Sequence, residues 1–124
     1  MVSDNLDDKE ENVFYAMAKN TFRFLVGGIP VSMIIDSGAD VNIIDESTWK
    51  QIRQAGLVMK DYSIQADRKL TGYASKQPMT ITCTFWAEVE AGTNKADAKF
   101  YVVQDGQRNL LGDATAKQLK ILKV

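Results

Sequence analysis

The residues best suited to chemistry lie in one short stretch, MIIDSGADVNIID, which runs from Met33 to Asp45. It places an ionisable side chain, Asp36, directly after three apolar residues and directly before Ser, Gly and Ala. Asp and Ser bond nearby backbone groups and Gly adopts unusual dihedral angles, so all three types are also common in turns. The stretch therefore fits two interpretations, a turn without a catalytic role or an exposed carboxylate with one.

The composition of the chain restricts the chemistry in which Asp36 could take part. There is no histidine, and Cys83 is the one cysteine. Ser-His and Cys-His nucleophilic pairs and the usual structural zinc ligand sets are therefore excluded. The sequence also contains no GxxxxGK or GxGxxG loop for a nucleotide phosphate. We expect any catalysis to depend on carboxylates, with no metal and no organic cofactor.

The size and charge are those of one ordinary soluble domain. The 124 residues are 45% hydrophobic and 25% charged, which is enough to build a core without disulfides. Lys plus Arg number 15 and Asp plus Glu 16, so the formal charge is −1, and we expect neither a nucleic-acid nor a membrane partner. Residues 1–12 hold five acidic side chains and one lysine, a net of −4, which leaves +3 for the rest. We expect 1–12 to be an acidic flexible leader and 13–124 to be the folded domain.

The cysteine content and the first residues favour a cytoplasmic protein. One cysteine cannot form an internal disulfide, and the chain does not start with the charged-then-apolar pattern of a signal peptide. The longest apolar region, residues 24–35, is interrupted by Gly, Pro and Ser and is too short to cross a bilayer. We therefore expect a reducing, intracellular setting.

The first half of the chain predicts strands around the Asp36 stretch. TFRFLVGGIPVSMII, residues 21–35, contains two β-prone runs separated by a Gly-Gly pair, which is typical of a hairpin that leads into Asp36. After the Asp-Ser-Gly-Ala turn, residues 41–44 suit a short buried strand. Asp45 is then a helix N-cap before ESTWKQIRQA, and Gly56 ends that helix.

The second half predicts more strands and a second helix. MTITCTFWAEVE, which begins at Met79, alternates apolar and polar residues, as in a strand with one buried face. Together with the preceding LTGYASKQP it suggests a long hairpin over residues 70–89, with an exposed tip near 73–76. Another strand ends at an Asp105-Gly106 turn. Residues 109–124 then suggest an apolar pair, a Gly, a helix and a terminal strand, so the chain as a whole reads as an all-β fold.

Two segments read together resemble the retropepsins, the aspartic proteases of retroviruses and LTR retroelements. They are IIDSGA at residues 34–39 and NLLGDATAKQL at residues 109–119. The resemblance is greatest to proteases of gypsy-class LTR retrotransposons, because VNIID, a helix with a Trp, a Gly-Tyr hairpin and LLG follow one another in that order. It implies a retropepsin-like closed β-barrel or sandwich with a flap hairpin and one or two short helices, half of a pepsin-like fold.

The resemblance implies catalysis by a pair of aspartates. Two adjacent carboxyls that share a proton can activate a water and protonate the peptide carbonyl. Because the chain has a single Asp-Ser-Gly, it supplies half of such a site, and a homodimer would bring two copies of Asp36 together. In this interpretation Asp36, Ser37 and Gly38 are the catalytic residues, with Ser37 bonding across the pair.

The resemblance also implies how an extended peptide binds. The hairpin over residues 70–85 corresponds to a flap that closes over the substrate and excludes water. The expected substrate-binding residues are Ala39, Asp40, Gly72, Tyr73, Ala74, Ser75 and Leu111. The implied activity is that of an aspartic endopeptidase that processes a Gag-Pol-type polyprotein, in the cytoplasm or within the virus-like particles of a retroelement.

One departure from the family pattern leaves other functions open. Viral members have Arg after the second Gly, where it pairs with the acid that corresponds to Asp40, but Asp113 occupies that position here. Two acids in these places would repel each other. The alternative is a domesticated, weak or inactive protease fold that serves as a dimerisation or peptide-binding module. A cellular ubiquitin-linked shuttle protease of the same superfamily fits less well, because of the VNIID and TAKQL details.

Overall fold

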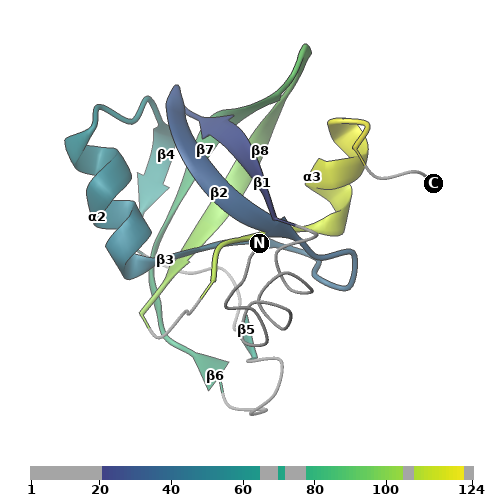
Figure 1. Ribbon diagram of the computed structural model, residues 1–124. Helices are drawn as coiled ribbons and strands as arrows, with labels where there is room; N and C mark the ends of the chain where they lie inside the picture. The colour runs from purple at the N-terminus through teal and green to yellow at the C-terminus, as the bar shows by residue number, and fades with distance from the viewer. Residues whose placement is uncertain (1–20, 65–69, 72–77, 105–107, 122–124) are drawn as a thin grey trace, which may run out of the picture.

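The structure is a computed structural model that describes residues 21–64, 70–71, 78–104 and 108–121. These residues form nine strands and two helices (Figure 1). In chain order they are β1 (Thr21–Val26), β2 (Ile29–Ile35), β3 (Asn42–Asp45), α2 (Glu46–Gln54), β4 (Lys60–Ser63), β5 (Leu70–Thr71), β6 (Pro78–Met79), β7 (Ile81–Ala91), β8 (Asn94–Val103), β9 (Leu110–Leu111) and α3 (Asp113–Gln118). The predicted leader, hairpin tip, Asp105-Gly106 turn and terminal strand over residues 122–124 lie outside the described residues.

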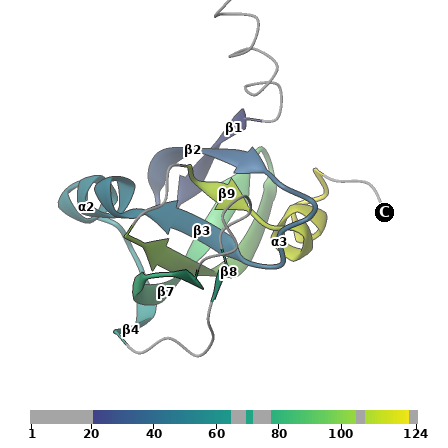
Figure 2. The same cartoon turned by 90° about the horizontal axis from the view of Figure 1, so that it is seen from below.

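The strands form a barrel that closes between β1 and β7. Seven strands follow the order β1-β2-β9-β3-β8-β7-β4, and β1 also pairs with β7. One edge of the long strand β7 pairs with two others, since Trp86 lies opposite Lys60 of β4 and Val89 lies opposite Val26 of β1. β9, from the end of the chain, lies between β2 and β3 (Figure 2). The predicted all-β closed barrel is therefore confirmed.

The hairpin of β1 and β2 turns at two glycines, as predicted. Gly27 and Gly28 have φ angles of +56° and +90°, in the left-handed region that favours Gly. A Cβ on Gly27 would also collide with the backbone of Val58, whose N–H donates to the Gly27 carbonyl at 3.1 Å. The hairpin therefore needs a glycine here both for its backbone conformation and for a close contact, and it delivers β2 directly to Asp36.

The alternation predicted from Met79 onward is confirmed from Cys83 to Val89 of β7, with one exception. Before Cys83 it fails, because the strand register shifts between Ile81 and Cys83, and Met79 and Ile81 belong to a second apolar cluster and not to the main core. Four apolar residues of this strand are buried in the main core: Cys83, Phe85, Ala87 and Val89. The pattern places Thr84 on the polar face, yet it is only 2% exposed. Its cross-strand partner, Tyr101 of β8, belongs to a second apolar cluster on that face. This part of the sheet is therefore buried on both faces, which alternation alone could not reveal.

The main core fills the barrel and extends beneath α2. Trp49 and Ile52, three residues apart, are the buried residues of this helix. The Trp49 ring stacks on Phe85 with 4.9 Å between centroids, and Phe85 stacks on Phe100 with 5.2 Å. Aromatic pairs at such distances stabilise a core beyond the area they bury. α2 is thus held to the barrel by the side chains that its helical spacing predicts.

Asp45 caps α2, as its type and position predict. Its backbone is extended, and its carboxylate accepts the N–H of Thr48 at 2.8 Å. Asp45→Ala removes this acceptor, so we expect the free energy of unfolding to fall by about 1 kcal/mol. Asn caps helices as well as Asp does, so Asp45→Asn should retain nearly the wild-type value. Urea titration followed by circular dichroism measures both variants, and a wild-type midpoint for Asp45→Ala would contradict the cap.

α3 follows β9 and fixes the end of the chain to the barrel. Ala116 of α3 and Leu119, which follows the helix, are fully buried. The Leu119 carbonyl also accepts a hydrogen bond from Asn94 Nδ2 at 2.9 Å, at the turn between β7 and β8. Within the described parts of the chain, neither helix is long and apolar enough to cross a membrane.

Candidate functional site

Asp36 lies in the connection from β2 to β3, here called the Asp36 loop (residues 36–41). This loop begins with a turn. The Asp36 carboxylate accepts the N–H of Gly38 at 2.9 Å, and the Asp36 carbonyl accepts the N–H of Ala39 at 3.0 Å. Asp36 is half-buried, whereas Ser37 and Gly38 are exposed. Residues 36–39 therefore form a turn, and this turn leaves the Asp36 side chain partly exposed.

The second motif of the sequence holds this loop from behind. β9 pairs with the end of β2 and with β3, so it lies between the two strands that flank the Asp36 loop (Figure 2). The N–H of Asp36 donates to the Leu111 carbonyl at 2.9 Å. The N–H of Asp113 donates to the Ala39 carbonyl, also at 2.9 Å. The two segments that carry the family resemblance are therefore in contact, although they come from opposite ends of the fold.

Gly112 lets these two segments approach each other. A Cβ on Gly112 would lie 2.7 Å from the carbonyl oxygen of Val41 and 3.1 Å from that of Ala39. Its φ of −78° is ordinary, so Gly is required here for space and not for backbone conformation. Leu111 beside it is fully buried in the main core, whereas Leu110 is half-buried. Leu111 therefore supports the Asp36 loop through its carbonyl group, and its side chain packs in the core.

Asn42, to which the sequence interpretation gave no role, is buried at the start of β3, with 5% of its surface exposed. Its Oδ1 accepts the N–H of Gly112 at 2.8 Å. Its Nδ2 donates to the Thr115 hydroxyl at 2.9 Å and to the Lys99 carbonyl at 3.0 Å. One side chain thus joins β3, β8, the turn at Gly112 and α3. The signal that could have revealed it is a polar residue at the first position of a short apolar strand.

A second apolar cluster adjoins the Asp36 loop. Its buried members are Ile43, Leu70, Tyr101 and Val103, and its half-buried members are Val41, Met79, Ile81 and Leu110. The cluster connects the β5–β6 hairpin, where Leu70 pairs with Met79, to β3, β7, β8 and β9. The predicted flap residues Gly72, Tyr73, Ala74 and Ser75 fall between β5 and β6 in the sequence, outside the described residues. This cluster therefore includes Val41, the last residue of the Asp36 loop.

The acid that replaces the expected Arg is paired within its own helix. A carboxylate oxygen of Asp113 lies 3.1 Å from the Lys117 ammonium, one turn along α3. Both side chains are partly exposed, so the pair contributes little to stability. It nevertheless offsets one negative charge, which reduces the predicted repulsion between Asp113 and the exposed Asp40. Across the described ranges, no three His, Cys, Asp or Glu side chains are grouped to hold a metal ion.

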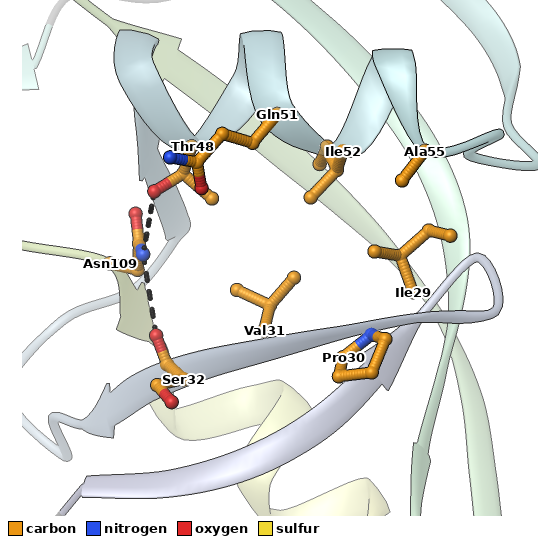
Figure 3. Close-up of a pocket in the computed structure, with 9 residues that line it drawn as sticks. All are labelled: Ile29, Pro30, Val31, Ser32, Thr48, Gln51, Ile52, Ala55 and Asn109. Atoms are coloured by element: carbon orange, nitrogen blue, oxygen red, sulfur yellow. Dashed lines mark hydrogen bonds between the residues drawn. The ribbon is translucent and has the colours of Figure 1, made fainter.

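A hollow of about 400 Å³ lies between β2 and α2, and no residue of the Asp36 loop lines it (Figure 3). Asn109 closes one end, where its Nδ2 donates to the Thr48 hydroxyl at 3.1 Å and to the Ser32 carbonyl at 3.3 Å (Figure 3). Its Oδ1 also accepts the N–H of Asp45 at 3.0 Å. Asn109 therefore joins β2, β3 and α2 through its side chain.

Cys83 is buried in the core and is not a reactive thiol. It is 1% exposed, and burial raises the pKa of its thiol to about 11, although Arg53 and a hydrogen bond with Tyr62 favour the thiolate. An ordinary thiol titrates near 9.0. The unfolded chain therefore releases this proton at a lower pH than the folded one, so the contribution of Cys83 to stability is complete below about pH 9 and is lost toward about pH 11.

We accordingly expect the free energy of unfolding to decrease between about pH 9 and pH 11 by more in the wild type than in Cys83→Ala. Tyr and Lys also titrate in this range, and the comparison of the two proteins removes their contribution. Urea titrations at several pH values measure the difference. If the free energy of unfolding changed with pH in the same way in both proteins, the Cys83 thiol would titrate at the same pH in the folded and the unfolded state.

The closed barrel with its two short helices has a counterpart among solved structures. It has a retropepsin-like fold, half of a pepsin-like fold. Among solved structures, the EIAV protease in complex with the inhibitor HBY-793 matches with a TM-score of 0.67 and 13% identity, over 84% of this chain and 90% of that one. No protein-family model and no curated protein matches the sequence. The retropepsin-like fold predicted from the two motifs is confirmed, as a likeness of fold.

Proposed function

We propose that this protein is an aspartic endopeptidase that is active as a homodimer. The observation that carries the proposal is the construction of the Asp36 loop, an accessible carboxylate on a tight turn that residues 111–113 hold from behind. The chain has one Asp-Ser-Gly loop, so one copy provides one carboxyl. Because this type of peptide hydrolysis needs an acid and a base together, the second carboxyl comes from an identical chain across a two-fold axis.

In the proposed dimer the two Asp36 carboxyls share one proton, because like charges so close together cannot both ionise. The ionised carboxyl takes a proton from a water, whose oxygen bonds to the peptide carbonyl carbon. The protonated carboxyl donates its proton to the carbonyl oxygen. The C–N bond of the diol then breaks as the carboxyl that took the water proton gives it to the departing amine. The other carboxylate takes a proton from a diol hydroxyl, which becomes part of the new carboxylic acid, and both carboxyls return to their starting state. Ser37, exposed beside Asp36, would bond across the axis.

The proposed substrate is an extended, largely apolar peptide segment of a Gag-Pol-type polyprotein. The second apolar cluster supports the apolar character, because it includes Val41, the last residue of the Asp36 loop. Main-chain bonds to an extended peptide would give affinity, and alternate side chains would give specificity. The order of motifs along the sequence supports a gypsy-class retroelement as the source, with action in the cytoplasm or in virus-like particles.

The experiment that tests the proposal is cleavage of a mixed peptide library at several acidic to neutral pH values, with and without pepstatin, beside a native mass measurement. We expect a dimer whose cutting pepstatin inhibits. Cutting that is insensitive to pepstatin, or cutting by a monomer, would contradict a shared pair of aspartates.

The second candidate is a protease fold that binds peptide or dimerises without cutting. It is favoured by Asp113, which stands where viral members have an Arg that pairs with the acid corresponding to Asp40; Asp113 itself pairs with Lys117. A dimer that binds library peptides and cuts none at any pH would establish this function. Any cleavage that is lost when Asp36 is replaced would exclude it.

A further inference from the structure

We propose that Asn42 is a positioning residue that sets the place of Asp36 through the backbone of Gly112. The inference deepens the proposed function and rests on it, because two Asp36 carboxyls must meet within hydrogen-bond distance across an axis. Displacements well below the length of a side chain then matter for the reaction.

The Asn42 amide uses both of its N–H donors and its oxygen on partners within the fold. A side-chain amide has two N–H donors and one carbonyl oxygen. Here both donors are used, on Thr115 and on the Lys99 carbonyl, and the oxygen accepts from Gly112. With 5% exposure, water cannot readily replace any of these partners. Because an unsatisfied buried N–H is costly, the Gly112 N–H is held in one direction.

Gly112 lies at the centre of the contact with the Asp36 loop. The residue before it, Leu111, accepts the N–H of Asp36, and the residue after it, Asp113, donates to Ala39. The Gly112 Cα itself packs so closely against the loop that a Cβ would not fit. A rotation of the peptide planes around Gly112 would therefore move both hydrogen bonds at once. Asn42 accepts the N–H of one of those peptide planes. It therefore restrains the rotation that would move the two hydrogen bonds to the Asp36 loop.

Asn109 provides a control with the same bonding pattern at another place. Like Asn42, it accepts one backbone N–H and donates to one backbone carbonyl and one Thr hydroxyl, here those of Asp45, Ser32 and Thr48. None of these partners belongs to the Asp36 loop. Asn109→Ala therefore removes the same kinds of bond as Asn42→Ala, from β2 and the start of α2 only.

The first measurement is amide hydrogen exchange of the whole chain by NMR. We expect Asn42→Ala to lower the protection of the Gly112, Asp113 and Asp36 amides at least tenfold relative to core amides such as Val89. In Asn109→Ala these three amides should keep their wild-type protection relative to the same reference. Unchanged relative protection in Asn42→Ala would overturn the proposal, whatever its effect on activity.

The second measurement separates positioning from general loss of stability. With the dimer confirmed by native mass, we expect Asn42→Ala to lower kcat at least tenfold with KM within threefold of wild type, because the loop that carries Asp36 moves while the apolar surface remains. Asn109→Ala should keep kcat within twofold. Equal losses of kcat in the two variants would overturn the proposal.

Two outcomes of these measurements are treated separately. If Asn42→Ala does not fold, Asn42→Thr takes its place, because a β-branched side chain suits a strand and its hydroxyl is too short to reach Gly112 and Thr115 together. If the wild-type dimer cuts no peptide, the proposed function fails, and the exchange measurement alone decides whether Asn42 holds the Asp36 loop.

Discussion

Asp36→Asn is expected to abolish peptide cleavage and to leave the fold intact. An Asn Oδ1 can still accept the N–H of Gly38, which Asp36 accepts at 2.9 Å, so the turn at the start of the loop is kept. An amide can neither take a proton from water nor donate one as a carboxylic acid does. General acid and base catalysis contributes about 10² to 10⁴-fold in rate, so we expect kcat to fall by at least about 10³-fold. Peptide hydrolysis assays and circular dichroism measure the two effects.

The chain contains its own control for this substitution, because Ile-Ile-Asp occurs twice, at residues 34–36 and 43–45. Asp45→Asn makes the same chemical change at the cap of α2, where Asn is equally suitable, and should retain both stability and cleavage. A tandem chain of two linked copies with a single Asp36→Asn should be as inactive as the double variant, since the carboxyls act as a pair. Half of the wild-type activity in that tandem chain would show that each copy works alone.

Gly112→Ala is expected to have the second largest effect, on stability and on activity together. The new methyl group would lie 2.7 Å from the Val41 oxygen, so either the Asp36 loop or the Leu111–Asp113 segment must move. Overpacking of this kind costs about 1–3 kcal/mol of the free energy of unfolding. Because the displaced segment accepts the Asp36 N–H, we also expect kcat to fall at least tenfold. A tenfold loss corresponds to an increase of about 1.4 kcal/mol in the activation free energy. Urea titration and peptide hydrolysis measure the two losses.

Gly92→Ala is the matched control. Gly92 has a φ of +62° in the turn between β7 and β8, and nothing lies within 4 Å of a Cβ built on it. Backbone strain should lower the stability by about 1 kcal/mol, while the Asp36 loop stays in place and kcat remains that of the wild type. If Gly112→Ala lost stability and kept wild-type kcat, the contact at Gly112 would matter for folding alone.

The features that could be predicted from the sequence are those that depend on neighbours along the chain. The Gly-Gly hairpin follows from two adjacent residues that tolerate positive φ, and the cap at Asp45 follows from a carboxylate three residues before the N–H it accepts. The buried face of β7 follows from alternation, and the buried residues of α2 follow from helical spacing. In each case the physical cause operates over a few residues.

The features that local patterns did not reveal involve contacts between distant segments. Thr84 has the polar type and the position of an exposed residue, but a second apolar cluster covers that face of the sheet. The side chain of Leu111 packs in the main core, so this residue reaches the Asp36 loop by its carbonyl. Asn42 gave no signal of its own, because its three partners come from β8, the Gly112 turn and α3.

By itself, the sequence restricted the groups that could do chemistry here: it has no histidine and one cysteine, and it places Asp36 at the end of a predicted strand. It also determined, through its two motifs, the fold to which the chain corresponds. Only the tertiary structure decided that β9 enters between β2 and β3, and that Gly112, held by Asn42, supports the loop of Asp36. The reason is physical. Local periodicity predicts which face of a helix or strand is buried. Which segment packs on that face depends on strand register and on the close approach that a missing Cβ allows.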